Sequence, residues 1–243
     1  MRAVSAPGRD NDLAHGMRWG TLLGLLALGI AILLLRRVPY AEFAVYPFRL
    51  FATFVHEIAH GLAALASGGR FEHFFVNPDL SGTAWSSGGV RWIVTSAGYV
   101  GCALFGNLLI VLAARGFPGR AVLLSLGLLL GLACLLFVRN AFGIGSGLVL
   151  AAALVLAALR LPPVWRDSLL LVLAVQLVLD GFNSLIDLVQ LAADPDVHTD
   201  ARTMAELTGI PATLWAVLWS TLSGVFLVFT LLIACRGPQR RPT

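Results

Sequence analysis

Long apolar segments separated by short polar linkers dominate this chain. We count seven of them, each long enough or nearly long enough to cross about 30 Å of hydrocarbon. They are residues 19–36, 46–66, 92–114, 120–138, 143–160, 167–190 and 212–235. Of the 243 residues, 58% are hydrophobic and 12% are charged, whereas about a quarter of a soluble domain is charged. We therefore expect an all-α fold, a polytopic transmembrane helical bundle with about seven spans, or six.

The apolar segments form one membrane domain in this interpretation. It covers residues 19–236, between a polar tail at 1–18 and another at 237–243. The first segment ends in Arg36-Arg37 without a small-x-small cleavage pattern. We therefore interpret it as a retained transmembrane helix rather than a cleaved signal peptide.

Charge and cysteine content exclude several other classes of protein. The formal net charge of +4 comes from arginine alone, because the sequence contains no lysine. No basic cluster with interleaved aromatic residues is present, so nucleic acid is not an expected partner. Cys102, Cys134 and Cys235 form no CxxC pair. We expect these cysteines to be small apolar residues rather than parts of a disulfide framework or a thiolate zinc site.

Two linkers are long enough to hold structure of their own. Residues 68–89 combine aromatic and β-branched residues on either side of Asn77-Pro78-Asp79, which predicts a β-hairpin. Residues 192–211 contain a candidate N-cap at Thr199 or Asp200. This pattern predicts a short helix that ends near residue 209 and lies at the membrane surface.

The second apolar segment carries the strongest chemical signal, the stretch TFVHEIAHGL at residues 53–62. His56 and His60 are four residues apart and therefore share one face of a helix. An HExxH helix of this kind holds Zn²⁺ through two neutral imidazoles, and its glutamate reaches the water that the metal activates. We expect Glu57 to act as the general base that later protonates the leaving amine.

A structural role is the alternative for these three residues, with hydrogen-bonded histidines and Glu57 paired to an arginine. An ionisable group at bilayer depth costs about 2.5–3.5 kcal/mol even on the lenient insertion scale. Three such groups without a chemical role would be hard to tolerate in a helix that is otherwise apolar on all sides. The metal site is therefore the favoured interpretation.

A zinc site needs at least one further protein ligand, and the sixth segment offers carboxylates. Its polar residues follow helical spacing on one face: Gln176, Asp180, Asn183, Ser184 and Asp187. Asp187 is the expected third ligand and Asp180 is the alternative. His198 and Asp200 are weaker candidates, because a solvent-facing helix cap is the simpler interpretation of Asp200.

Two asparagines are candidates for binding a substrate backbone. Asn107 lies in the glycine-rich third segment, and Asn183 lies on the polar face of the sixth. Bridging between helices is the favoured alternative for Asn107.

These motifs together resemble the site-2 protease family of intramembrane metalloproteases, the M50 class, and its compact bacterial M50B-like branch most closely. The resemblance is carried by HEIAHGLAALASGG at 56–69, the following hairpin segment, SAGYVG, NSLIDL and HTDARTMAELTGIPATLW. It implies zinc held by two histidines and an aspartate, and a β-hairpin that adds a substrate segment as an extra strand. The LDG triplet at 179–181 lacks the Asn/Pro-rich pattern of many relatives, so Asp187 matches the family's acidic position better than Asp180.

The sequence thus predicts a zinc-dependent metalloendopeptidase that cleaves membrane proteins in or near their transmembrane segments. Its expected location is the bacterial cytoplasmic membrane, with the lipid bilayer and a membrane-protein substrate as partners. One alternative is a non-proteolytic relative that binds membrane proteins. A small transporter, with the polar faces lining its path, is a second alternative.

Overall fold

The computed structural model describes residues 10–35, 37–186 and 199–235. Its helices and strands are α1 (Asp10–Leu35), α2 (Glu42–Ala66), β1 (Arg70–Val76), β2 (Gly82–Ser87), α3 (Arg91–Ala114), α4 (Gly119–Phe137), α5 (Ala141–Arg160), α6 (Pro163–Asp180), α8 (Asp200–Thr208) and α9 (Ala212–Cys235). The predicted all-helical bundle with one small hairpin is confirmed. Helix α1 already includes part of the segment predicted as an N-terminal tail, and the C-terminal tail lies outside the described residues.

Within the described residues, four helices are long and apolar enough to cross a membrane: α3, α4, α5 and α9. The predicted count of about seven spans is therefore not confirmed. The apolar part of α1 that the structure describes is short, covering Leu23–Leu35. Helices α2 and α6 are less apolar, because they carry the ionisable side chains of the site described below.

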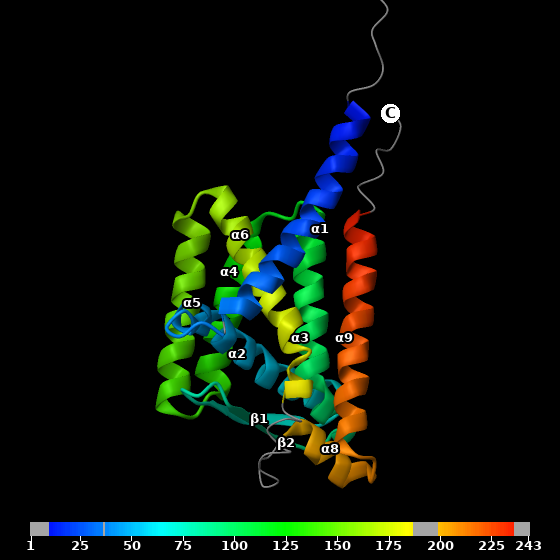
Figure 1. The fold of residues 1–243 in the computed structure, drawn as a ribbon. Coiled ribbons are helices and arrows are strands. Elements are labelled where there is room, and N and C mark those ends of the chain that lie inside the picture. Colours follow the sequence, from blue (N-terminus) through cyan, green and yellow to red (C-terminus); the bar gives the residue numbers. More distant parts are fainter. Residues whose placement is uncertain (1–9, 36, 187–198, 236–243) are drawn as a thin grey trace, which may run out of the picture.

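The elements are arranged so that one end of the bundle is covered by the hairpin and α8 (Figure 1). Helices α4 and α5 run side by side at one edge, and α3 and α9 run side by side at the other. Helices α2 and α6 cross obliquely between these pairs. The main hydrophobic core joins them and includes Phe54 of α2, Leu109 of α3 and Leu177 of α6.

The hairpin predicted after the HExxH helix is confirmed. Strands β1 and β2 are antiparallel, with Phe74 opposite Ala84 and Val76 opposite Gly82. Phe74 and Val76 are fully buried against the helices, whereas β2 places small residues opposite them. The buried side chains of β1 therefore anchor the hairpin, and Gly82 of β2 lies directly against the side chain of Glu57.

Two hydrogen bonds fix the tip of the hairpin to α2. The Tyr46 hydroxyl donates to the Pro78 carbonyl at 2.7 Å. The Thr53 hydroxyl donates to the Leu80 carbonyl at 3.1 Å. The tip is therefore held in place one helical turn from His56.

The outer edge of β1 is occupied by the segment between α4 and α5. Phe74 forms a parallel bridge with Val138, and the Arg139 amide donates to the Phe74 carbonyl at 3.2 Å. The Asn140 side chain accepts from the Val76 amide at 3.2 Å and donates to the Val76 carbonyl at 2.6 Å. Only the edge of β2 remains open in the described part of this sheet.

The short helix predicted in the second long linker is also confirmed as α8. Thr199 is its N-cap, and the Thr199 side chain accepts from the Arg202 amide at 3.2 Å. Gly209 ends it in the left-handed region with φ 72°, a conformation that glycine adopts without a steric cost.

Helix α6 ends earlier than the predicted sixth span, at Asp180. The Phe182 amide donates to the Leu179 carbonyl, three residues back, so the chain tightens at Gly181 before helical structure resumes at residues 183–186. The predicted polar face is therefore interrupted at residues 181–182, although Asn183 still donates to Oδ1 of Asp180 at 2.7 Å. Ser184 instead lies 3.2 Å from Ser220 of α9 through their hydroxyl oxygens.

Close contact between α3 and α6 depends on Gly106, and we expect Gly106→Ala to destabilise the protein. An added Cβ would lie 2.7 Å from the Ala174 carbonyl oxygen and 2.8 Å from the Val178 amide. Such overpacking typically costs about 1–3 kcal/mol. Thermal unfolding in detergent measures the effect. Gly145→Ala is the matched control, because an added Cβ there meets nothing within 4 Å; equal melting temperatures for the two variants would contradict this packing.

Candidate metal centre

The HExxH segment lies in the second half of α2, where its two histidines face the same side. Their ring centroids are 4.9 Å apart, as expected for residues four apart on a helix. The neighbouring Phe54 is fully buried and Val55 packs against the same core. Apolar packing on the other sides of α2 thus turns the histidines toward one polar space.

Both histidines present the same nitrogen to one carboxylate oxygen. Nε2 of His56 lies 3.1 Å from Oδ2 of Asp200, and Nε2 of His60 lies 3.3 Å from the same atom. Burial raises the pKa of the Asp200 carboxyl, but His60 and His56 lower it by more, so this pKa lies below its usual range. The carboxylate is therefore ionised at neutral pH and available as a ligand.

The other ring nitrogens are held by acceptors. Nδ1 of His60 lies 2.7 Å from the Val94 carbonyl oxygen, and Nδ1 of His56 lies 3.4 Å from Oδ2 of Asp180. A carbonyl oxygen only accepts, so Nδ1 of His60 carries the proton. In the neutral imidazole Nε2 then offers a lone pair. This pattern, in which one nitrogen faces the centre and the other donates to a carbonyl or carboxylate, is characteristic of metal-binding histidines.

Each donor atom of this cluster suits a transition metal. One donor atom each from His56, His60 and Asp200 lies within 4.8 Å of the others. Two imidazole nitrogens and a carboxylate oxygen are a ligand set that zinc prefers in catalytic sites. Two lone pairs and a carboxylate directed at one point would repel one another unless a cation or protons lie between them.

Glu57 lies beside the histidines beneath the hairpin. Its side chain is 5% exposed, and an added Cβ at Gly82 would overlap its carboxylate. The first residue of β2 is therefore in direct contact with Glu57, and a larger residue there would displace the carboxylate.

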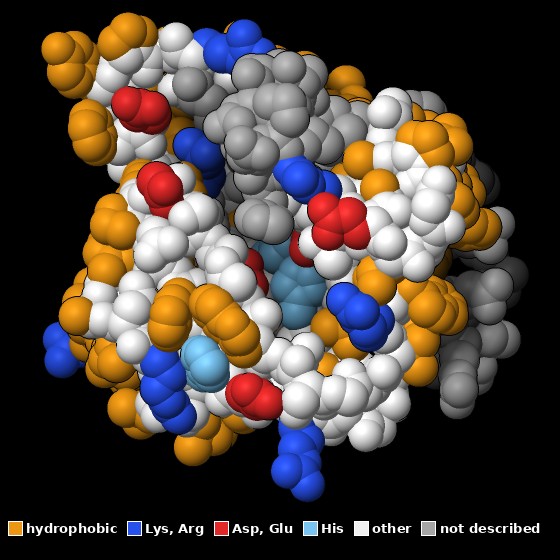
Figure 2. Space-filling view, turned by 90° about the horizontal axis from the view of Figure 1, so that it is seen from below, with side chains coloured by type: hydrophobic (Ala, Val, Ile, Leu, Met, Phe, Trp, Pro, Cys, Tyr) orange, Lys and Arg blue, Asp and Glu red, His pale blue; other side chains and the backbone are white. Residues whose placement is uncertain are grey.

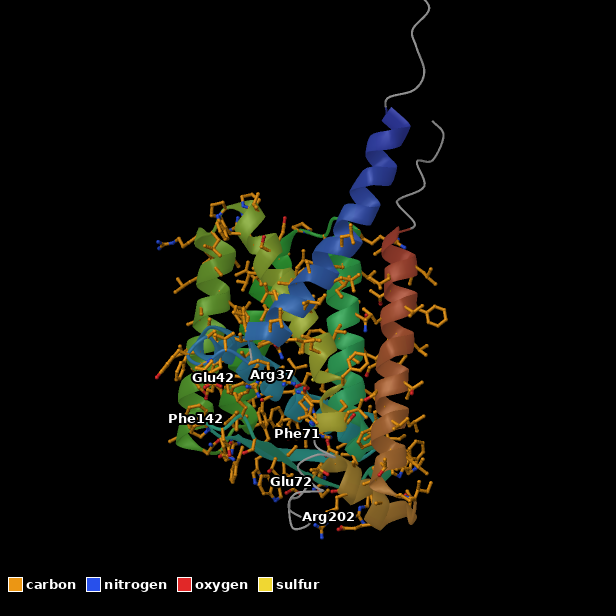
Figure 3. The ribbon with its side chains drawn as sticks, viewed as in Figure 1. Arg37, Glu42, Phe71, Glu72, Phe142 and Arg202 are labelled. Atoms are coloured by element: carbon orange, nitrogen blue, oxygen red, sulfur yellow. The ribbon has the colours of Figure 1, made fainter. Side chains whose placement is uncertain are left out.

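A cleft of about 960 Å³ opens over these residues. Its lining includes His56, Glu57 and His60 together with residues of β2, α3 and α8. Seen from the end covered by the hairpin and α8, histidine side chains form the floor of a hollow with acidic atoms beside them (Figure 2). Glu72 of β1 and Arg202 of α8 lie at this same end of the molecule (Figure 3). A cleft of this size is typical of binding sites.

The predicted site residues from the sixth span have different positions. Asp180 is buried and faces Nδ1 of His56. Asn183 lines the cleft and donates to Oδ1 of Asp180 at 2.7 Å. Asp187 lies outside the described residues. Asn107 is buried in α3 and donates to the Ala103 carbonyl at 2.8 Å; it is not among the described residues that line the cleft.

Asp200 is the residue that the sequence interpretation underrated. The capping role belongs to Thr199, and the Asp200 side chain, 22% exposed, faces the histidines. Its interpretation as a solvent-facing cap is therefore wrong. The sequence did contain a clue to this outcome. Thr199 directly precedes Asp200 and can cap the helix itself, which leaves the Asp200 carboxylate free for another contact.

The fold and the cluster together define a helical membrane protein with a metal-binding geometry on an HExxH helix. Comparison with known proteins identifies its family: the chain belongs to the Peptidase M50B-like family, whose model matches residues 23–230. The resemblance to the M50 site-2 proteases is thus confirmed. Membership indicates a membrane metalloprotease of a generally zinc-dependent class, and with the four apolar helices it indicates an integral membrane protein. No curated protein and no solved structure compared with the chain matches it.

Room for His56 depends on Gly98, and we expect Gly98→Ala to weaken zinc retention. An added Cβ would overlap Nε2 of His56 and displace the ring from Asp200. Displacing a ligand in this way should weaken zinc binding at least about tenfold, the size of effect seen when a supporting contact is lost. Zinc content of the purified protein after dialysis against a chelator measures this.

The matched control for this prediction is Gly101→Ala. It alters the same face of α3, but its Cβ would lie 2.7 Å from the Ala59 Cβ and would touch no histidine. If both variants lose zinc equally, general loosening of the α2–α3 contact is responsible, and the specific role of Gly98 is refuted.

Proposed function

We propose that this protein is a zinc-dependent intramembrane endopeptidase that hydrolyses peptide bonds in or near the transmembrane segments of other membrane proteins. The observation that carries the proposal is the convergence of two imidazole Nε2 atoms on one carboxylate, with Glu57 beside them in a cleft. Following the bacterial branch of the family, we place the protein in the cytoplasmic membrane of a bacterium.

His56, His60 and Asp200 are the proposed zinc ligands. Asp200 takes the place expected for Asp187, because its oxygen is shared by both histidines. Asp180 contacts only the outward nitrogen of His56. We therefore assign Asp180 the task of orienting that ring and holding its proton on Nδ1.

When bound, zinc would polarise the scissile carbonyl and lower the pKa of a coordinated water. Glu57 takes a proton from the attacking water and gives it to the leaving amine. Its burial beneath Gly82 fixes the carboxylate in one orientation. Asn183, which donates to Asp180, supports the orientation of His56 indirectly.

The open edge of β2 is the proposed binding surface for an extended substrate segment. Gly82, Ala84 and Ser86 line the cleft, and the opposite edge of the sheet is already occupied by Val138 and Asn140. A substrate helix satisfies its own backbone amides, so it must unwind before hydrolysis. Hydrogen bonds to the β2 edge replace those that unwinding breaks.

The depth of the site in the bundle fits cleavage near a membrane surface. The His56 ring lies against Tyr99, with ring centroids 4.6 Å apart. Tyr99 is about two turns from the first residue of α3, or roughly 12 Å at 1.5 Å per residue. We propose that α1, α2 and α6 also lie within the bilayer, which gives the seven spans predicted from the sequence.

Loss of the general base is expected to slow hydrolysis strongly without removing the metal. Glu57→Gln should retain zinc and slow cleavage by about 10²–10⁴-fold, the usual contribution of general acid–base catalysis. The measurement is cleavage of a panel of single-span membrane proteins in detergent or proteoliposomes, with zinc content determined on the same samples.

The outcomes of that experiment separate the alternatives. A wild-type protein without a transition metal, or a Glu57→Gln variant that cleaves as well as wild type, would overturn the protease assignment. Bound zinc with no cleavage of any panel member would favour the non-proteolytic relative. Ion flux through proteoliposomes without stoichiometric zinc would favour the transporter.

The third ligand is tested by replacing the three aspartates separately. Asp200→Ala should lose most of its zinc, because it removes a ligand. Asp180→Asn should weaken zinc binding by about 10–100-fold, as expected for a supporting contact, and Asp187→Ala should bind zinc as tightly as wild type. Chelator competition measures all three. Zinc loss in Asp187→Ala with retention in Asp200→Ala would show that the assignment is wrong.

A further inference from the structure

A second cluster of metal-binding side chains lies behind the HExxH histidines, and the proposed mechanism does not use all of it. One donor atom each from His56, Cys102 and Asp180 lies within 4.8 Å of the others. Cys102 comes from α3 and is fully buried. Cys134, the other cysteine whose side chain the structure describes, belongs to no such cluster among the described residues.

His56 belongs to both clusters because its two nitrogens face different carboxylates. Nε2 lies 3.1 Å from Asp200 and Nδ1 lies 3.4 Å from Asp180. The Cys102 sulfur lies within 4.8 Å of a ring nitrogen of His56 and of a carboxylate oxygen of Asp180. The sulfur also lies 3.7 Å from the Ala52 carbonyl, one turn before His56 on α2. The three groups thus form a closed triangle on the inner side of the imidazole.

We propose that His56, Cys102 and Asp180 form an inner metal site that takes a second, thiophilic divalent cation such as Cd²⁺ or excess Zn²⁺. One thiolate, one imidazole nitrogen and one carboxylate are a donor set suited to such ions. Binding releases two protons, one from the Cys102 thiol and one from Nδ1 of His56. The His56 ring would then lie between the inner cation and the zinc of the proposed function. The inference rests on that function for the zinc bound to Nε2 of His56.

Occupation of the inner site is inhibitory. A cation bound to Asp180 removes this carboxylate as the hydrogen-bond acceptor of His56. It also places a second positive charge on the opposite side of the His56 ring from the zinc. Both His56 and Asp180 line the cleft, so a cation that enters the cleft reaches Asp180 first and Cys102 behind it. Excess zinc or cadmium would therefore lower activity by binding to Cys102, a residue that takes no part in hydrolysis.

The test is a cadmium titration of the purified full-length protein in detergent, loaded with one equivalent of zinc. The readout is the ultraviolet charge-transfer absorption of a cadmium–thiolate bond, which the outer site cannot give because it contains no sulfur. Wild type is expected to develop this absorption, saturating at one equivalent. Cys102→Ser is expected to lose it, whereas a variant with Cys134→Ser and Cys235→Ser keeps it.

Two further variants keep the result interpretable. Asp180→Asn retains the thiol and should bind cadmium at least about tenfold more weakly, which covers the case in which Cys102→Ser fails to fold. Asp200→Ala should keep the cadmium–thiolate absorption although it loses zinc, so failure of the proposed function is distinguishable from failure of the inner site. Absence of the absorption in wild type, or its persistence in Cys102→Ser, would overturn the proposal.

Discussion

The fold depends on supplying hydrogen-bond and ion-pair partners to ionisable groups that are buried in apolar surroundings. Three such groups occupy five successive positions of α2, where each unpartnered charge would cost several kcal/mol. The partners of the two histidines are the Val94 carbonyl of α3, Asp180 of α6 and Asp200 of α8. These contacts fix the relative positions of α2, α3, α6 and α8. The same contacts therefore stabilise the fold and assemble the site.

Two glycines of α3 leave the space that these contacts need. Gly98 leaves room for the His56 ring, and Gly101 lets the backbone lie close to Ala59. Between them Tyr99 reaches past His56 to Trp219 of α9, with ring centroids 5.6 Å apart. One turn of α3 therefore both admits the imidazole and links it to the last helix of the bundle.

The features that could be predicted from the sequence are the local ones. Helical spacing identified His56 and His60 as one face with Glu57 next to them, and turn residues identified the hairpin and α8, because these patterns depend on neighbours within a few residues. Asp200 could not be identified this way, since its contact with His56 spans 144 positions of the chain and depends on how α8 packs. The sixth segment was predicted as one regular helix, whereas the helix is interrupted at residues 181–182, where tertiary contacts outweigh the local pattern.

The placement of the open β2 edge has a consequence for the folding and lifetime of the protein. An unpaired strand edge normally invites pairing with another copy and hence aggregation. Here the Asn140 side chain covers one edge of the sheet, and the other edge borders the cleft that holds Glu57. Any strand that pairs with β2 must therefore lie in the cleft, over Glu57. On the proposed function, the recess that receives one extended peptide would thus also limit edge-to-edge pairing between two copies of the chain.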